Sequence, residues 1–361
     1  EADMGSHLRQ FHSNQRLVQR SGVIPGVVMA LDKALNTFIL KHTAYQGIRN
    51  AVLAVGGPGV PPGTGEEFIF KDVAMAMANA LLEFSYSPDN AAEIVRARGI
   101  DCMPGLLAAH IHDPTVFLGL ELLWNCLEAG SPGHRLGPIH NSTTEAMARF
   151  MSRLLVSFLD HGFKSTDKHS RNEVLLMLML MMEEPGFRRE LCATGVVPHL
   201  VAIATTPEVA GSHPLVKPFL LTTEAEEFEM RQLAWTCLTS MCHEAGCRAE
   251  AVQGGLLNAM LMYVDVEILG GQGEQSAVVQ RWTPSQLRSL QDVALGQTCR
   301  LAAMDPDTFL QFGGPDTLLQ LVSYENDAAL LEAALKVLQS CAAAPALRDK
   351  LGRGGMLPTA L

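Results

Sequence analysis

The sequence predicts an all-α fold, a right-handed superhelical solenoid of armadillo or HEAT type with about six repeats and loop insertions. One observation is a recurring phrase in which a polar residue precedes a cysteine within a helical pattern. Another is a glycine pair that follows each late copy, and the spacing from Gly313 to Gly354 falls in the roughly 40 to 47 residue period of such repeats. The copies of the phrase are Trp124-Asn125-Cys126, Trp235-Thr236-Cys237, Gln297-Thr298-Cys299 and Gln339-Ser340-Cys341.

The composition of the chain agrees with packed helices. Of 361 residues, 48% are hydrophobic, 18% are charged and only 6% are aromatic, so the chain can bury a large core. The longest uninterrupted apolar run, residues 174–182, is far shorter than the roughly 20 residues that span a bilayer, and it predicts a buried helix. Eight scattered cysteines are typical of small buried apolar residues and indicate a reducing, cytoplasmic compartment.

Glycine turns and insertions divide the chain in order. Glycine suits the left-handed turn that ends a helix, and such turns are predicted at Gly22, Gly99, Gly195, Gly254-Gly255, Gly313-Gly314 and Gly354-Gly355. Polar, Gly/Pro-rich insertions lie at residues 56–65, 130–144, 205–227 and 270–284, and extra length of this kind maps to loops on one face of a solenoid. We expect one armadillo-like repeat domain over residues 1–361, as a segment of a longer protein.

The clearest repeat covers residues 314–355. Pro315 and Asp316 predict the start of a short helix through Ser323, because proline suits a first helical turn and aspartate complements the helix N-terminus. A longer helix follows, and a third, short helix covers residues 345–351 before a glycine-rich stop. The apolar stripe of the longer helix is predicted to contain Leu330, Leu331, Ala334, Leu335, Leu338 and Cys341.

Motifs that echo chemical sites are better explained as structure. Residues 61–67 resemble the phosphate loop of ATPases, but Glu66 and Glu67 stand where that loop has its lysine and hydroxyl residue, and they would repel a polyphosphate. Cys237, Cys242 and Cys247 would fan out around a helix instead of converging on zinc.

The pair His110 and His112 beside Asp113-Pro114 could suggest acid–base chemistry. Aspartate followed by proline is instead typical of a helix start, with the aspartate as the cap. We therefore expect no catalytic residue, no cofactor, no metal site and no enzyme activity.

The recurring polar residue is the candidate binding position. In armadillo proteins that bind extended peptides, the third helix of each repeat lines a concave groove and presents an asparagine to the ligand backbone. The residues at this position are Asn79, Asn125, Thr236, Thr298 and Ser340. Short hydroxyl side chains on helices often bond to their own backbone, so the pattern favours helix packing and leaves a peptide-binding groove as an open alternative.

Electrostatics narrow the class of partner. The net charge is −11, the isoelectric point is near 5.5, and no run of basic residues is longer than Arg188-Arg189. The chain therefore lacks the basic stripe that nucleic acid or an acidic membrane requires. The same charge disfavours broad docking on the acidic surface of a microtubule, so proteins are the expected partners.

Three segments of the chain go beyond a generic armadillo repeat. They are residues 121–128, 161–173 and 215–229, with a weaker region around Arg281-Trp282. Together they cover roughly residues 115–300 and include an insertion that ordinary repeats do not have. In these segments the chain resembles the armadillo-like cilia- and flagella-associated protein sixty-nine family.

The resemblance implies a non-enzymatic structural scaffold of the motile-cilium axoneme, associated with the central apparatus. Its expected role is to bind other projection proteins and support ciliary beating, with direct tubulin contact minor at most. Residues 130–144 and 205–227 are the expected contact loops. The competing hypothesis is a soluble armadillo adaptor, of transport or signalling type, that binds an extended peptide in its groove.

Overall fold

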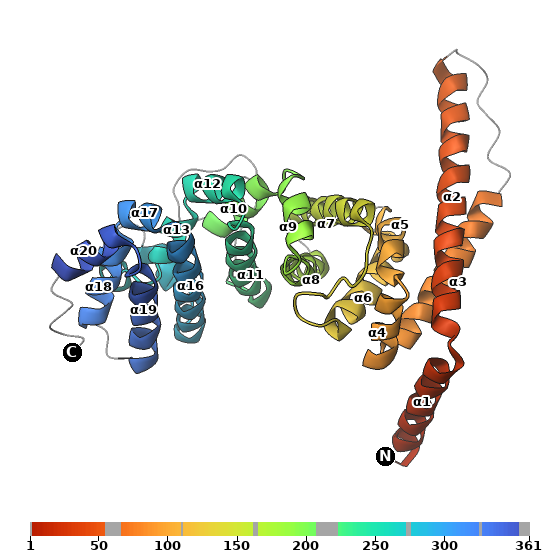
Figure 1. The fold of residues 1–361 in the computed structure, drawn as a ribbon, viewed down its shortest axis with the longest axis horizontal. Coiled ribbons are helices and arrows are strands. Elements are labelled where there is room, and N and C mark those ends of the chain that lie inside the picture. Colours follow the sequence, from red (N-terminus) through yellow and green to blue (C-terminus); the bar gives the residue numbers. More distant parts are fainter. Residues whose placement is uncertain are drawn as a thin grey trace. The chain divides into compact units, whose positions relative to one another are not determined.

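The computed structural model describes residues 2–54, 66–109, 111–161, 165–206, 223–271, 276–324 and 327–353, and within these ranges it contains helices and no strand (Figure 1). The predicted all-α fold is confirmed. The helices are α1 (Ala2–Ser21), α2 (Val23–Ala54), α3 (Glu66–Ser85), α4 (Pro88–Arg96), η1 (Gly99–Cys102), α5 (Met103–Leu107), α6 (Pro114–Ala129), α7 (Asn141–His161), α8 (Ser165–Met181), α9 (Pro185–Cys192), α10 (Val197–Thr205), α11 (Ala225–Met241), α12 (Ala245–Gln253), α13 (Leu256–Leu261), α14 (Val266–Leu269), α15 (Ser276–Gln280), α16 (Pro284–Met304), α17 (Pro306–Gln311), α18 (Gly314–Tyr324), α19 (Ala328–Cys341) and α20 (Pro345–Arg353).

The chain packs as two compact units. Unit 1 comprises Glu1–Ser157 with Leu180–Leu191, and unit 2 comprises Phe158–Met179 with Cys192–Leu361. In unit 1, α3 packs against α2 and α6. In unit 2, α11 packs against α10 and α16, and α16 packs against α19.

The long helices α3, α6, α8, α11, α16 and α19 occupy the third-helix position of successive repeats. A short helix follows most of them, and α4, α9, α17 and α20 each begin with a proline, namely Pro88, Pro185, Pro306 and Pro345. Proline suits this position because its missing N–H would have no partner in a first helical turn. The exception is α6, which is followed by a loop and the long α7, so residues 131–183 form the least regular repeat.

The repeat predicted over residues 314–355 is present as α18, α19 and α20, but the buried face of α19 differs from the predicted stripe. Leu330, Ala334 and Leu338 are buried as expected, whereas Leu335 is 41% exposed. The buried face also includes Val337, which is 1% exposed. On a helix Leu335 lies about 100° from Ala334, and that step carries it off the core-facing side.

In each of the two described late glycine pairs, one glycine adopts a positive φ and the other allows a close contact. Gly255 has a φ of 88°, a left-handed conformation that side chains disfavour. At Gly254 an added Cβ would lie 2.1 Å from Val201 Cγ1, so the helices can approach only over a glycine. Gly313 has a φ of 71°, and a Cβ on Gly314 would lie 2.0 Å from Phe309 Cε2. The two-glycine signal therefore marks both a turn and a close contact.

The turn predicted at Gly99 differs in detail. Its left-handed residue is Arg98, with a φ of 67°, and not the glycine. Gly99 is required for space instead, because a Cβ there would lie 2.4 Å from Ile94 Cγ2. Gly22 and Gly195 do adopt positive φ, as predicted, while Gly354-Gly355 lies outside the described residues.

The predicted loop insertions differ in how far the structure describes them and in whether they are loops. Residues 56–65 lie outside the described part of the chain, as does most of 205–227, including residues 207–222. Residues 270–284 were predicted as a loop, yet they contain α15, and Trp282 is buried and donates to Tyr263 Oη at 2.9 Å. An aromatic anchor of this kind organises a segment that composition alone marks as a loop.

All but the last residue of the apolar run 174–182 lies in α8, and most of its residues are buried, as predicted. Among the described residues, one helical stretch is long and apolar enough to cross a membrane by length and composition, Val23–Thr43, which has a mean hydropathy of 1.5 and is 28% buried. Mostly buried core helices and signal sequences near an N-terminus meet the same criterion, so one such stretch is weak evidence of a membrane segment.

Candidate protein-interaction surface

Polar side chains connect neighbouring third helices in unit 2. Gln232 Nε2 of α11 donates to Ser289 Oγ of α16 at 2.6 Å. One turn further along, Gln297 Nε2 donates to Thr236 Oγ1 at 3.3 Å. Between α16 and α19, Cys299 Sγ lies 3.5 Å from Ser340 Oγ. The recurring phrase thus places polar groups at equivalent points of consecutive helix pairs.

The hydroxyl residues of the predicted groove turn back on their own helices. Thr236 Oγ1 donates to Gln232 O at 2.9 Å, and Ser340 Oγ donates to Val337 O at 2.7 Å. Thr298 is 1% exposed, so its side chain is buried and does not reach solvent. These contacts are those expected of a helix-packing role.

The two asparagines lie in unit 1. Asn125 Nδ2 donates to Ser85 Oγ at 2.8 Å and so joins α6 to α3. Asn79 is exposed, and its Nδ2 donates to Met75 O at 2.9 Å, one turn back on α3. Peptide binding by this set stays a prediction.

A buried cluster of charges joins the N-terminal halves of α8 and α11. Lys168 Nζ lies 2.8 Å from Glu224 Oε2 and 3.2 Å from Glu227 Oε1. Arg171, which is fully buried, places Nη1 3.5 Å from the same Glu227 oxygen. Asn172 Nδ2 donates to Glu229 Oε2 at 2.9 Å, so three polar side chains of α8 contact carboxylates of residues 224–229.

Burial and charge act in opposite directions on this cluster. Burial alone would lower the pKa of Lys168, but hydrogen bonds to Glu224 and Glu227 outweigh it and raise that pKa. For Arg171 burial prevails and lowers the guanidinium pKa, against the pull of Glu227. Removal of one member of a buried pair leaves an uncompensated charge and typically costs about 3–5 kcal/mol. The cluster therefore holds α8 and α11 in one register.

This charge cluster links the two segments that set the sequence apart from a generic repeat. Lys168 and Arg171 belong to residues 161–173, and Glu224 and Glu227 belong to residues 215–229. Sequence reasoning singled out both segments and missed their contact. The sequence held one signal for this contact, because the first segment carries lysine and arginine and the second carries several glutamates. Only the fold shows that the two segments meet.

Trp235, in the second copy of the phrase, bonds to the end of a neighbouring helix. Trp235 Nε1 donates to Ala204 O at 2.8 Å, and the buried Arg231 donates to Ile203 O at 2.8 Å and to Thr206 O. These bonds satisfy carbonyl groups at the C-terminal end of α10, which have no partner within the helix. They anchor the start of the 205–227 insertion.

The other expected contact loop was residues 130–144. Residues 141–144 form the start of α7, and the remaining loop, residues 130–140, is held firmly in unit 1. Arg135 donates to Leu127 O at 2.9 Å and to Glu183 Oε2 at 3.1 Å, and Leu136 is buried. Pro132, His134 and Pro138 are exposed. The loop thus exposes two prolines and a histidine on a fixed backbone. Because the backbone is already ordered, little conformational entropy is lost when a partner binds.

The motifs that echoed chemistry have structural partners. Asp113 caps α6 and accepts from Thr115 N at 2.9 Å, as predicted, while His110 and most of residues 61–67 lie outside the described residues. Cys237 is buried and donates to Leu175 O at 3.3 Å, and burial raises its pKa to about 12. Within the described ranges no group of three or more His, Cys, Asp or Glu side chains is placed to hold a metal ion.

The structure has the features of an armadillo-repeat protein. The third helices of neighbouring repeats pack against each other, short helices that begin with proline follow most of them, and glycine turns separate the repeats. The family model described as "Cilia- and flagella-associated protein 69, ARM repeat" matches residues 70–331, and this chain belongs to that family. The match extends from α3 into α19, beyond the segments that suggested the resemblance.

Relatives named "Cilia- and flagella-associated protein 69" are 23% identical in Mus musculus and 22% identical in Homo sapiens, each over 60% of this chain. The chain spans 22% of the length of these relatives. Two engineered proteins of known crystal structure are also similar. One has a TM-score of 0.46 and 16% identity, with 75% of this chain and 91% of that chain covered. The other has a TM-score of 0.47 and 18% identity, with coverage of 78% and 58%.

Proposed function

We propose that this chain is part of a non-enzymatic scaffold in the axoneme of motile cilia or flagella, within the central apparatus. It binds other projection proteins there and supports beating. The observation that carries the proposal is the family match over residues 70–331, which includes parts of both structural units. Relatives whose name states association with cilia and flagella support the location.

The surface of the chain supports a protein-binding role. The 130–140 loop is exposed at its prolines and fixed by Arg135, and no packing need of a three-helix repeat requires its length. A net charge of −11 favours attachment through neighbouring proteins over direct coating of tubulin, and over nucleic acid or acidic membrane.

The experiment places the full-length protein in ciliated cells and measures its retention in detergent-extracted axonemes. The loop variant combines Pro132→Glu with Pro138→Glu, which changes the exposed surface and leaves Arg135 and Leu136 in place. Tyr324→Glu, at an exposed position of α18, is the matched control. We expect the wild type and the control to stay in the axoneme and the loop variant to be released more readily.

Two outcomes separate the parts of the proposal. Wild-type protein confined to the cell body would contradict the axonemal scaffold. Retention of the loop variant at the wild-type level would show that the 130–140 loop is not the contact. If Asn125→Ala with Thr236→Ala releases the protein instead, the peptide-binding groove becomes the better account.

A further inference from the structure

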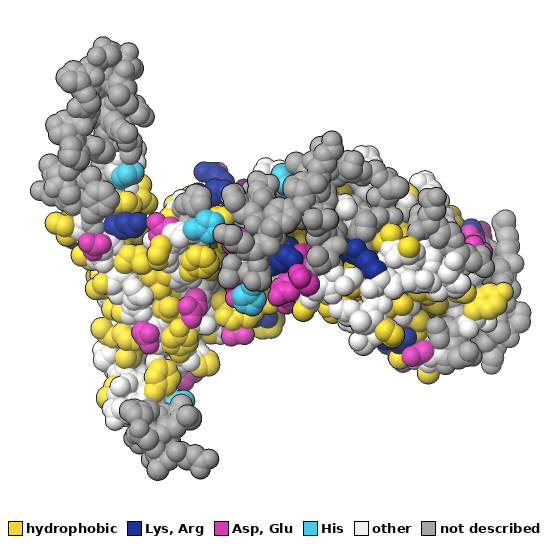
Figure 2. All heavy atoms as spheres, turned by 180° about the vertical axis from the view of Figure 1, so that it is seen from behind, with side chains coloured by type: hydrophobic (Ala, Val, Ile, Leu, Met, Phe, Trp, Pro, Cys, Tyr) yellow, Lys and Arg dark blue, Asp and Glu magenta, His cyan; other side chains and the backbone are white. Residues whose placement is uncertain are grey.

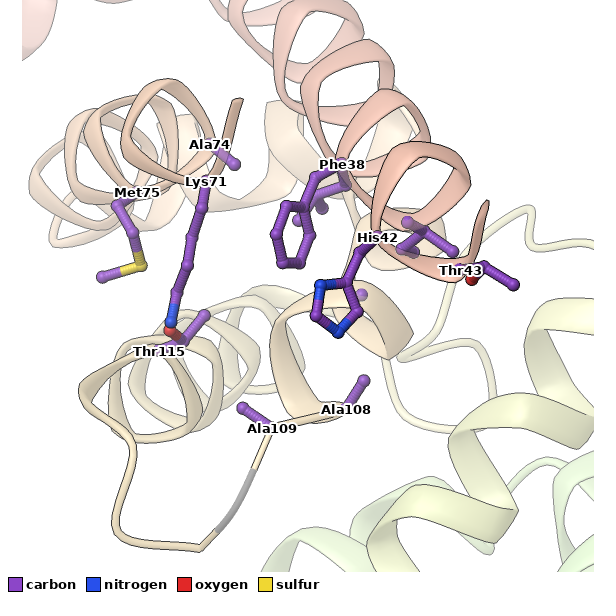
Figure 3. Close-up of a pocket in the computed structure, with 12 residues that line it drawn as sticks. Phe38, His42, Thr43, Lys71, Ala74, Met75, Ala108, Ala109 and Thr115 are labelled. Atoms are coloured by element: carbon purple, nitrogen blue, oxygen red, sulfur yellow. The ribbon is translucent and has the colours of Figure 1, made fainter. Parts of the chain in front are cut away.

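Unit 1 contains an apolar pocket of about 320 Å³ where α2, α3, α5 and α6 meet (Figure 3). Figure 3 shows the Phe38 ring directed toward the space that Ala74, Ala108 and Ala109 leave open. Figure 2 shows hydrophobic side chains on the surface formed by the helices at this end of the chain. Apolar walls accept many kinds of occupant, so a more specific chemistry is that of a pair of cysteines in unit 2.

The side chains of Cys192 and Cys247 meet in unit 2. Cys192 is the last residue of α9, and Cys247 lies in the first turn of α12. A hydrogen bond joins the two side chains, and both are thiols that belong to no disulfide. Cys192 is partly exposed, whereas Cys247 is 6% exposed. The pair is therefore in direct contact, and solvent reaches it through Cys192.

The repeat architecture explains why two residues far apart in the chain meet. α9 and α12 are equivalent short helices, because each follows a third helix, α8 or α11. Each also bonds back to the end of that helix in the same way. Arg188 Nη1 donates to Met182 O at 3.4 Å, and Arg248 Nη1 donates to Cys242 O at 2.8 Å, six residues back in both cases. Neighbouring repeats of a solenoid are in contact, so equivalent helices can bring their cysteines together.

The contact also changes the chemistry of one thiol. The hydrogen bond with Cys192 lowers the pKa of Cys247, against burial and the charges of Glu250 and Glu244, which would raise it. A hydrogen bond to the charged form favours that form. The N-terminal turn of a helix favours a thiolate in the same way. Cys247 is therefore available as a nucleophile at a lower pH than an ordinary thiol.

A third cysteine, Cys242, lies near Cys247 and differs from both members of the pair. Burial raises the pKa of Cys242 to about 12, and the nearby sulfur of Cys247 raises it further. The side chain of Cys242 is 0% exposed. A protonated thiol without access to solvent is a poor nucleophile and a poor target for an oxidant, so Cys192 is the expected partner of Cys247.

We propose that Cys192 and Cys247 form a modification site at which a peroxide produces a reversible disulfide. The site goes beyond the proposed scaffold function, which requires no redox chemistry. The disulfide joins the two ends of the segment that carries α10, α11 and the 205–227 insertion, one of the expected contact loops.

The reaction has two steps that balance with hydrogen peroxide as the oxidant. The sulfur of Cys192 attacks one oxygen of the peroxide, the O–O bond breaks, and the other oxygen leaves as water with the thiol proton, which gives a sulfenic acid. The sulfur of Cys247 then attacks the Cys192 sulfur, the S–S bond forms, and the hydroxyl leaves as a second water with the proton of Cys247. The two thiols lose two electrons, and the peroxide gains them.

The test treats the purified full-length protein with a small molar excess of hydrogen peroxide, alkylates the remaining thiols and maps disulfides by mass spectrometry of unreduced peptides. Trypsin leaves Cys237, Cys242 and Cys247 in one peptide, residues 232–248, so fragment spectra identify which of them is linked. We expect the main disulfide to join Cys192 to Cys247, and dithiothreitol to reverse it.

Cys299 supplies the matched control, because it is also partly exposed but contacts Lys336 O and Ser340 Oγ. We expect Cys299→Ser to keep the disulfide and Cys192→Ser to abolish it. In Cys247→Ser the sulfenic acid of Cys192 loses its nearest thiol, so its labelling by dimedone should rise several-fold over the wild type. Circular dichroism confirms that each variant is helical, and the wild-type map needs no variant.

Three results would overturn the proposal. They are a Cys192 that remains a thiol in the treated wild type, a main disulfide between Cys242 and Cys247, and a Cys192 linked only between two molecules. None of them changes the axonemal retention result, so this proposal and the scaffold function fail separately.

Discussion

Two helix interfaces in unit 2 differ in what they bury. Between α16 and α19 the buried contact is apolar, with Leu338 and Cys341 buried. Its polar contacts, which include a thiol–hydroxyl pair and an ion pair between Arg288 and Asp327 at 3.0 Å, lie at partly exposed side chains.

Between α8 and α11 the N-terminal halves meet through Lys168, Arg171 and Glu227. An apolar interface tolerates many partners, whereas buried charges accept only a complementary surface. The charged interface therefore specifies which repeats are neighbours.

The apolar interface should respond most strongly to an introduced charge. Leu338→Asp buries an unpaired carboxylate and opens a cavity, and we expect the free energy of unfolding to fall by more than about 4 kcal/mol. Leu335→Asp is the control, because Leu335 is 41% exposed, and its effect should stay within about 0.5 kcal/mol. Urea denaturation measures both. Equal losses would mean that the buried face of α19 is wrongly assigned.

The charged interface between α8 and α11 should lose stability when one member of a buried ion pair is removed. Glu227→Leu leaves Arg171 buried without its carboxylate, and we expect a loss of about 3–5 kcal/mol. Adding Arg171→Met removes the stranded charge and should recover a large part of that loss. If the double variant is no more stable than Glu227→Leu, the two residues are not coupled as the geometry implies.

A glycine contact gives an intermediate effect. At Gly254 a methyl group would meet Val201 Cγ1, so Gly254→Ala should cost about 1–3 kcal/mol through overpacking. Gly246 has nothing within 4 Å of its would-be Cβ, and Gly246→Ala should be neutral or slightly stabilising, by up to about 1 kcal/mol. Thermal unfolding of both variants checks the contrast. Similar melting temperatures would contradict the close approach of α10.

The last effect concerns pH and is absent near neutrality, because it appears only above the pKa of an unfolded thiol, about 8.5. Burial raises the pKa of the Cys126 and Cys237 thiols to about 12, whereas an unfolded thiol has a pKa of about 8.5. The folded state thus favours the protonated thiol. This stability is fully present below the unfolded pKa, and it is lost as pH rises toward about 12.

Alkaline denaturation of the wild type and of Cys237→Ala measures this term. We expect the stability of the wild type to fall more steeply between roughly pH 8.5 and 12. An identical slope for the two proteins would show that the Cys237 thiol titrates as it does in the unfolded chain.

Short-range patterns in the sequence were enough to predict the repeats. The phrase, the glycine pairs and the capping Asp113 each depend on residues close together in the chain, and their roles follow from backbone geometry. Leu335 was misassigned because two adjacent apolar residues, Ala334 and Leu335, both fit one broad stripe. Only packing against α16 decides between such neighbouring positions.

Long-range features could not be predicted in the same way. The pairing of Arg171 with Glu227 joins residues 56 positions apart, and no periodicity links them. The pocket beside Phe38 is lined from α2, α3, α5 and α6, so its space depends on how those helices pack. Arg98 took the left-handed conformation expected of Gly99, and the close approach of Ile94 that requires the glycine is visible only in the fold.

The most direct test of the scaffold is a density map of intact motile cilia in which this chain can be placed by its own side chains. The account predicts that residues 70–331 fit as an armadillo solenoid in the central apparatus, with the 130–140 loop against a neighbouring protein. The account is contradicted if the chain is absent from the axoneme, or if that loop faces solvent while another face makes every contact.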